Sequence, residues 1–159
     1  MNTITTAVVV TFIFRGYVLV SGSADLCDIY LTLENTIPCG SSGYALGYGY
    51  PNCERFGQQE HLYNQAGKNF IDCTRTCLIN YVQTNFLNNP SNLTCAAIKD
   101  EAFSSHVPCY INCGFCNACR TNQIALAMTY NITDFMSSLA IQQVVQVIKA
   151  CAPMPCLPM

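Results

Sequence analysis

The sequence predicts an all-α fold, a small disulfide-cross-linked helical bundle with a glycine- and tyrosine-rich loop near its N-terminus. Apolar residues recur at helical spacing in several segments, and strand-like alternation is absent over any useful length. An even number of cysteines behind an apolar leader is typical of a disulfide framework, so we expect all of them to be oxidised. The twelve are Cys27, Cys39, Cys53, Cys73, Cys77, Cys95, Cys109, Cys113, Cys116, Cys119, Cys151 and Cys156.

The first 24 residues are predicted to be a secretion signal. Residues 7–14 are apolar except for one threonine, and small residues precede a cleavage site after Ala24. An uncleaved membrane anchor is the alternative, but Arg15 would lie near the middle of its span. No later segment is long and apolar enough to span a bilayer. We therefore expect a single secreted, extracellular domain over residues 25–159, with no membrane contact after cleavage.

The charged residues and the glycosylation sequons indicate what the surface of the protein is like. The chain has seven Lys and Arg residues against nine Asp and Glu, without a basic patch, so nucleic acid is not an expected partner. Asn92 and Asn131 each begin an Asn-x-Thr sequon between apolar periodic segments. We expect both to carry glycans.

A short first helix is predicted from Leu26, Ile29 and Leu33, and Pro38 ends it. Residues 40–52 contain four glycines, which favour an irregular loop over a helix. The tyrosines of this loop have two interpretations. They are candidate contacts for a binding partner, or they pack over the helices. They are Tyr44, Tyr48 and Tyr50.

The middle of the chain carries the clearest periodicity. Pro51 suits the first turn of a helix that reaches about Tyr63. Over residues 67–87, Phe70, Cys73, Cys77 and Tyr81 fall on one stripe of the longest predicted helix. The Asn- and Pro-containing residues 88–92 interrupt it.

Three further segments complete the predicted bundle. Thr94 can cap a helix that covers at least residues 95–105, whereas residues 106–114 contain Pro108 and Gly114 and stay unassigned. A helix is expected over residues 117–130. A last helix should start near Thr133, with Asp134 in its first turn. Its apolar side includes Phe135, Leu139, Val144, Val147, Ile148 and Cys151.

The sequence gives little support for catalysis or for metal binding. Residues 113–119 have the Cys-x-x-Cys spacing twice, which in another setting indicates zinc or thiol exchange. The leader and the even cysteine count favour disulfides instead. His106 lies in a string similar to that of secreted phospholipases, but Val107 stands where calcium chemistry needs an oxygen ligand. We therefore expect no enzyme activity, no metal and no cofactor.

From Cys53 onward the chain resembles the stanniocalcins, secreted helical glycoprotein hormones. Two runs carry the resemblance, Cys-x-x-Phe at residues 53–56 and Gly-Lys-x-Phe at residues 67–70, and a cysteine follows at position 77. The spacings among the later cysteines fit as well, over roughly residues 53–151. They involve Cys95, the Cys109-Tyr110 pair, Cys116 and Cys151.

The resemblance implies a disulfide pattern, which sequence alone does not establish. It pairs Cys77 with Cys109, Cys116 with Cys151, Cys39 with Cys95, and Cys27 with Cys53. Four cysteines then lack family counterparts and divide naturally into Cys73 with Cys113 and Cys119 with Cys156. Because Cys156 is the only late cysteine, a covalent homodimer like that of the stanniocalcins is not expected.

The resemblance also implies a function, a hormone or regulator that binds an extracellular protein or receptor. Two alternatives stay open at this point. One is a venom or defence polypeptide that acts on a channel or receptor, and the other is an extracellular matrix component. All three functions depend on contact by a rigid scaffold rather than on catalysis.

Overall fold

The computed structural model describes residues 25–131, 137–152 and 156, so the predicted signal at residues 1–24 lies outside it. Its described part contains seven α-helices and no strand, which confirms the all-α prediction. They are α1 (Asp28–Thr36), α2 (Tyr50–Gln58), α3 (Gln65–Val82), α4 (Cys95–Asn112), α5 (Phe115–Thr121), α6 (Gln123–Thr129) and α7 (Ser138–Ala150). None of these described helices is long and apolar enough to cross a membrane.

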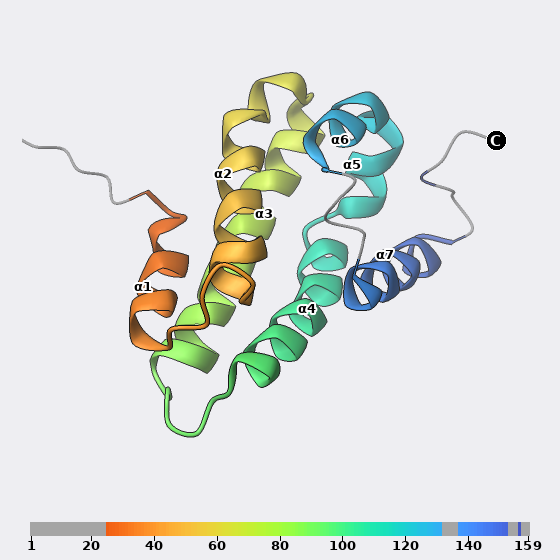
Figure 1. The fold of residues 1–159 in the computed structure, drawn as a ribbon. Helices are drawn as coiled ribbons and strands as arrows, with labels where there is room; N and C mark the ends of the chain where they lie inside the picture. The colour runs from red at the N-terminus through yellow and green to blue at the C-terminus, as the bar shows by residue number, and fades with distance from the viewer. Residues whose placement is uncertain (1–24, 132–136, 153–155, 157–159) are drawn as a thin grey trace, which may run out of the picture.

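Helices α3 and α4 form the antiparallel centre of the bundle (Figure 1). Disulfides Cys73–Cys113 and Cys77–Cys109 join them one turn apart, because cysteines four residues apart share a helix face. Helices α1 and α2 lie along one side of α3, and α5 and α6 lie at the end where α3 begins (Figure 1). Helix α7 packs against α4.

Five of the six expected disulfides are present. Besides the two that join α3 and α4, they are Cys27–Cys53, Cys39–Cys95 and Cys116–Cys151. The expected sixth bridge, Cys119–Cys156, is not formed, and both residues are buried free cysteines. The thiol of Cys119 instead donates a hydrogen bond to the carbonyl oxygen of Cys156 at 3.4 Å.

The glycine- and tyrosine-rich segment is more ordered than predicted. Only its first residues form a turn, and Ala45–Gly49 is a π-helical turn that leads into α2. Glycine is costly in a helix but here it is required by packing. A Cβ on Gly49 would lie 2.5 Å from the ring of Tyr30 on α1. The close approach of α1 therefore outweighs the intrinsic preference of these glycines for a loop.

Helix α4 runs through the segment that the sequence left unassigned. Thr94 caps it as predicted and accepts a hydrogen bond from the backbone N–H of Ala97 at 3.1 Å. Pro108 lies inside the helix, where proline removes one backbone hydrogen bond. The disulfides of Cys109 and Cys113 hold this last part of α4 against α3.

The expected helix over residues 117–130 is divided into α5 and α6 at Asn122. Asn122 leaves the helical conformation (φ −134°, ψ 34°) and its side chain reaches the start of α3. Its Oδ1 accepts from the N–H of Asn64 at 2.8 Å, and its Nδ2 donates to Oδ1 of Asn64 at 3.0 Å. This paired amide contact is the reason for the break, because a continuous helix would not present Asn122 in this way.

Helix α7 starts at Ser138 in the described part of the chain. Ser137 caps it by accepting from the N–H of Ala140 at 3.1 Å. Thr133, Asp134 and Phe135 lie outside the described residues.

The bundle has two apolar cores. The α1 core consists of Cys27, Tyr30, Leu33, Tyr44, Ala45, Cys53, Val82, Phe86, Ile98, Ala102, Phe103 and Ala140. The α6 core consists of Phe56, Tyr63, Phe70, Ile71, Tyr110, Phe115, Ala118, Cys119, Ala125, Leu126, Val147, Cys151 and Cys156. The two cores meet at the rings of Tyr44, Tyr48 and Tyr110 around His106.

Candidate ligand-binding site

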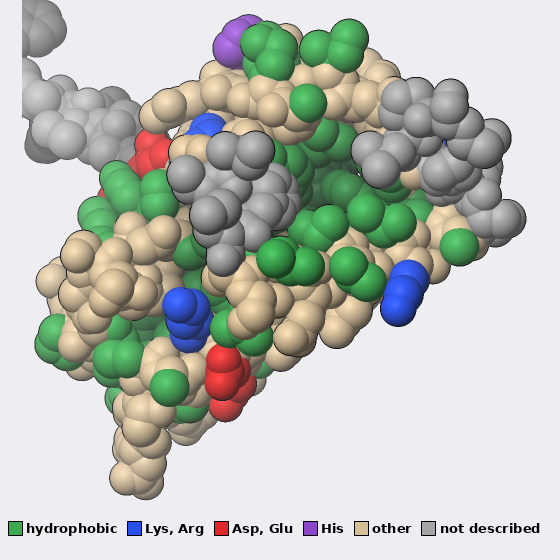
Figure 2. Space-filling model, turned by 45° about the vertical axis from the view of Figure 1, so that its right-hand side comes forward, with side chains coloured by type: hydrophobic (Ala, Val, Ile, Leu, Met, Phe, Trp, Pro, Cys, Tyr) green, Lys and Arg blue, Asp and Glu red, His purple; other side chains and the backbone are tan. Residues whose placement is uncertain are grey.

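A cavity of about 720 Å³ opens beside the α6 core and is the candidate site. Figure 2 shows hydrophobic side chains gathered in this hollow of the surface. The size is in the range of natural pockets for small molecules, and such pockets are mostly apolar. Its described lining residues are Tyr48, Tyr110, Phe115, Cys119, Gln123, Ile124, Leu126, Ala127, Tyr130, Ala140, Gln143, Val144, Val147, Ile148 and Cys156.

The cavity lies between aromatic rings on one wall and mostly aliphatic side chains on the other. Aromatic side chains from α4 and α5 pack edge to face against α3, as Phe70 and Phe115 do at 5.4 Å between ring centroids. The opposite wall comes from α6 and α7 and includes Ala127, Ala140 and Val144.

Helix α7 contributes five lining residues from one face. Ala140, Gln143, Val144, Val147 and Ile148 follow the spacing of an amphipathic helix. The sequence marked three of them, Val144, Val147 and Ile148, as an apolar face. It gave no signal that this face borders a cavity rather than a filled core.

Polar groups in the cavity are few, and none of the described lining residues is charged. The amide of Gln123 donates to the carbonyl oxygen of Cys156 at 3.1 Å. The hydroxyl of Tyr130 donates to that of Tyr110 at 3.4 Å, and burial raises the pKa of Tyr130 well above its usual value. Tyr130 is therefore neutral at physiological pH, and the described part of the cavity wall is uncharged and mostly apolar.

The free cysteines form part of this wall. Burial raises the pKa of the Cys119 thiol to about 12, and a hydrogen bond to Cys156 adds to the effect. Because the thiolate is the nucleophile, such a thiol is a poor one at neutral pH. The two Cys-x-x-Cys spacings offer neither a zinc site nor an exchange pair, since Cys113 and Cys116 are each bonded to a distant cysteine.

The three predicted contact tyrosines have different positions. Tyr44 is 2% exposed, so of the two interpretations its burial fits the one in which the ring packs over the helices, and not a surface contact. It packs against Tyr30 and Phe103, because its ring fills the space that the π-helical turn creates over α4. Tyr48 and Tyr50 are half-buried. Of the three, only Tyr48 lines the cavity.

His106 lies beneath the cavity, where it is buried among aromatic rings. Its Nδ1–H donates to the carbonyl oxygen of Ala102 at 2.6 Å, and its ring stacks on Phe103 at 5.6 Å between centroids. Burial lowers the pKa of His106 to about 4, so the imidazole is neutral at physiological pH. Its position makes it a packing residue rather than a general base.

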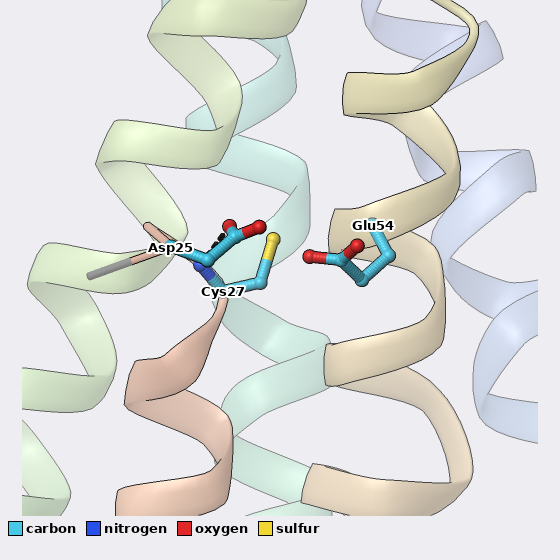
Figure 3. Close-up of side chains that lie close together, drawn as sticks. All are labelled: Asp25, Cys27 and Glu54. Carbon is cyan, nitrogen blue, oxygen red and sulfur yellow. Dashed lines mark hydrogen bonds between the residues drawn. The ribbon is translucent and has the colours of Figure 1, made fainter. Parts of the chain in front are cut away.

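Asp25, Cys27 and Glu54 lie within 4.8 Å of one another at the start of the described chain (Figure 3). The sulfur of Cys27 is bonded to Cys53, so it cannot act as a thiolate ligand. Asp25 accepts from the N–H of Cys27 at 3.0 Å and lies 3.9 Å from the guanidinium of Arg75. This cluster fastens the N-terminal segment to α2 and α3, and we assign no metal to it.

Both sequon asparagines are exposed. Asn92 lies in the turn before α4 and adopts a left-handed conformation (φ 67°) that asparagine tolerates. Asn131 follows α6, and the remainder of its sequon lies outside the described residues. Their exposure leaves room for glycans at both positions.

Neither a family model, nor a curated protein, nor a solved structure matches this chain. The resemblance to the stanniocalcins therefore stays a hypothesis that depends on cysteine spacing. The functional argument is based on the cavity alone.

Proposed function

We propose that this chain is an exported, glycosylated binding protein that holds a small apolar molecule in its cavity. The observation that carries the proposal is a cavity of about 720 Å³, with no charge among its described lining residues, in a small domain with five disulfides. A cross-linked scaffold keeps such a site open and lowers the entropy lost when a ligand binds. The apolar leader, the cysteine content and the exposed sequons support export and glycosylation.

The composition of the walls favours binding over catalysis. General acid–base chemistry needs a titratable group near its usual pKa that can reach the substrate. The described lining residues include no His, Asp, Glu, Lys or Arg, and burial raises the pKa of both the Cys119 thiol and the Tyr130 hydroxyl, so these two groups stay protonated at neutral pH. We infer that no bond is made or broken in this cavity.

The test is binding of the neutral fluorescent dye N-phenyl-1-naphthylamine to the oxidised protein. Val144 lines the cavity, whereas Val145 beside it on α7 is 43% exposed and does not. Val144→Trp should fill the space and weaken dye binding by roughly tenfold or more, about 1.4 kcal/mol. Val145→Trp adds the same ring outside the cavity and should leave the affinity nearly unchanged. Equal affinities for the two variants, or no dye binding by the native protein, would contradict the proposal.

A second candidate is the function that the resemblance implies, recognition of an extracellular protein partner by a secreted hormone-like regulator. Exposed apolar side chains on α6 and α7 favour it, because proteins commonly use exposed apolar surface for contact with a partner. They are Ile124, Met128, Ile141, Val145 and Ile148. A partner captured from extracellular fluid by the native protein, and lost with Met128→Asp and Ile141→Asp, would support this candidate.

A further inference from the structure

Gln143 is the one feature of the cavity that an apolar ligand alone does not explain. It lies on α7, is 6% exposed and lines the cavity. Among the described residues, its side-chain oxygen Oε1 has no hydrogen-bond partner. A buried carbonyl oxygen without a donor costs free energy, and nearly all such groups in native proteins have a partner.

The other glutamine of the cavity differs in this respect. Gln123 is half-buried, and its amide donates to the carbonyl oxygen of Cys156. It therefore helps to hold the cavity wall together. Among the described residues, the side-chain oxygen of Gln143 has no such internal contact, and it is shielded from water in the empty cavity, so a ligand donor reaches it when the Gln143 side chain turns toward the cavity.

We propose that the ligand is a neutral amphiphile, an apolar chain or ring system with a hydroxyl group that donates a hydrogen bond to Oε1 of Gln143. This inference rests on the proposed function and specifies the ligand class for the same site. The ligand hydroxyl supplies the missing hydrogen-bond donor to Oε1 of Gln143, and the apolar part of the ligand packs against the aromatic and aliphatic walls.

The absence of charge from the described walls selects against fatty acids and other anions. A carboxylate placed in an apolar site loses its hydration, and it needs a cation or several donors in return. None of the described lining residues is Lys, Arg or His. A neutral alcohol loses far less hydration and gains the hydrogen bond to Gln143.

The experiment compares three ligands of equal chain length as competitors of N-phenyl-1-naphthylamine on the oxidised protein. They are 1-decanol, 1-methoxydecane and decanoate at pH 7.4. The methyl ether can accept a hydrogen bond but cannot donate one, so it isolates the contact to Oε1. We expect the alcohol to bind roughly tenfold more tightly than the ether, with decanoate the weakest.

The matched variants are Gln143→Leu and Gln142→Leu, which make the same change on neighbouring residues of α7. Gln142 is exposed and does not line the cavity. Gln143→Leu should make decanol and the ether equal, whereas Gln142→Leu should keep the preference for the alcohol.

The outcomes separate the two proposals. If none of the three ligands displaces the dye, the proposed function fails. If all three displace it, but the ether or decanoate binds as tightly as the alcohol, the proposed function is supported and the proposed hydrogen bond to Gln143 is wrong. The ligand comparison on the native protein decides this even if Gln143→Leu does not fold.

Discussion

The α1 core and the α6 core are built from the same kinds of residue, yet one is filled and the other borders a large cavity. In the α1 core, the ring of Tyr44 packs edge to face against Tyr30 and Phe103, at 6.0 and 5.9 Å between centroids. The space at the boundary between the cores is about 40 Å³, whereas the cavity beside the α6 core is about 720 Å³.

The disulfides follow the same division. Cys27–Cys53 and Cys39–Cys95 tie α1, the segment after it, α2 and the start of α4 around the α1 core. On the cavity side, Cys116–Cys151 joins α5 to the end of α7, and Cys119 and Cys156 remain unlinked. A small domain can keep a hollow site because its other half is closely packed and cross-linked.

The largest expected effect comes from making the same change, isoleucine to alanine, once in each of the two regions. Ile98 is 2% exposed in the α1 core, whereas Ile148 lines the cavity and is 40% exposed. Ile98→Ala should lower the free energy of unfolding by about 2–5 kcal/mol, because it leaves a void in a filled core. Ile148→Ala should cost less than about 1 kcal/mol, because its side chain already borders open space. Denaturant unfolding of the oxidised proteins measures both, and equal losses would remove the distinction between the cores.

The next prediction concerns His106, where the two cores meet. Its pKa is lowered to about 4 in the folded protein, against an ordinary value near 6.5. Between these pH values the unfolded chain binds more protons, so stability falls as the pH falls. The expected loss from pH 6.5 to pH 4 is on the order of 3 kcal/mol from this residue.

Two variants isolate that contribution. His106→Phe should remove this part of the pH dependence, and Tyr44→Phe should keep it, because it changes a neighbouring ring without removing the imidazole. The measurement is the difference between the unfolding free energies of native and variant proteins across this pH range. Parallel curves for the native protein and His106→Phe would show that His106 is not the responsible group.

The helical architecture could be predicted because its determinants are local. The stripe of Phe70, Cys73, Cys77 and Tyr81 placed α3, and the side chain of Thr94 marked the start of α4. Five cysteine pairs could be expected from the resemblance and from the even count. Where the prediction was wrong, a contact distant in sequence overrode the local preference. The predicted helix over residues 117–130 is interrupted at Asn122, whose side chain contacts Asn64. Gly49 lies in a helical turn where the loop was predicted, because the ring of Tyr30 leaves no room for a Cβ.

The cavity could not be predicted from the sequence. Val144 and Val147 have the pattern of an ordinary core face, and nothing in that pattern shows that the face borders a cavity. Gln143 gives no signal either, because a glutamine beside another glutamine suits an exposed helix position. Its importance depends on burial and on the missing partner of its oxygen.

The smallest expected effect concerns the cavity wall, where Cys119 and Cys156 are free. It is measured by counting the thiols that a reagent labels. Unfolding without reduction should expose two thiols per chain, whereas six closed bridges, as the sequence predicted, would give none. In the native protein at pH 8, the pKa of about 12 for Cys119 should slow its labelling roughly a thousandfold relative to the unfolded chain. Cys119→Ser is the control and should leave one thiol. Rapid labelling of the native protein would contradict the prediction and mean that this part of the cavity wall opens readily. If the unfolded chain shows no free thiol, Cys119 and Cys156 are bonded to each other, and the cavity side is cross-linked as the α1 core is.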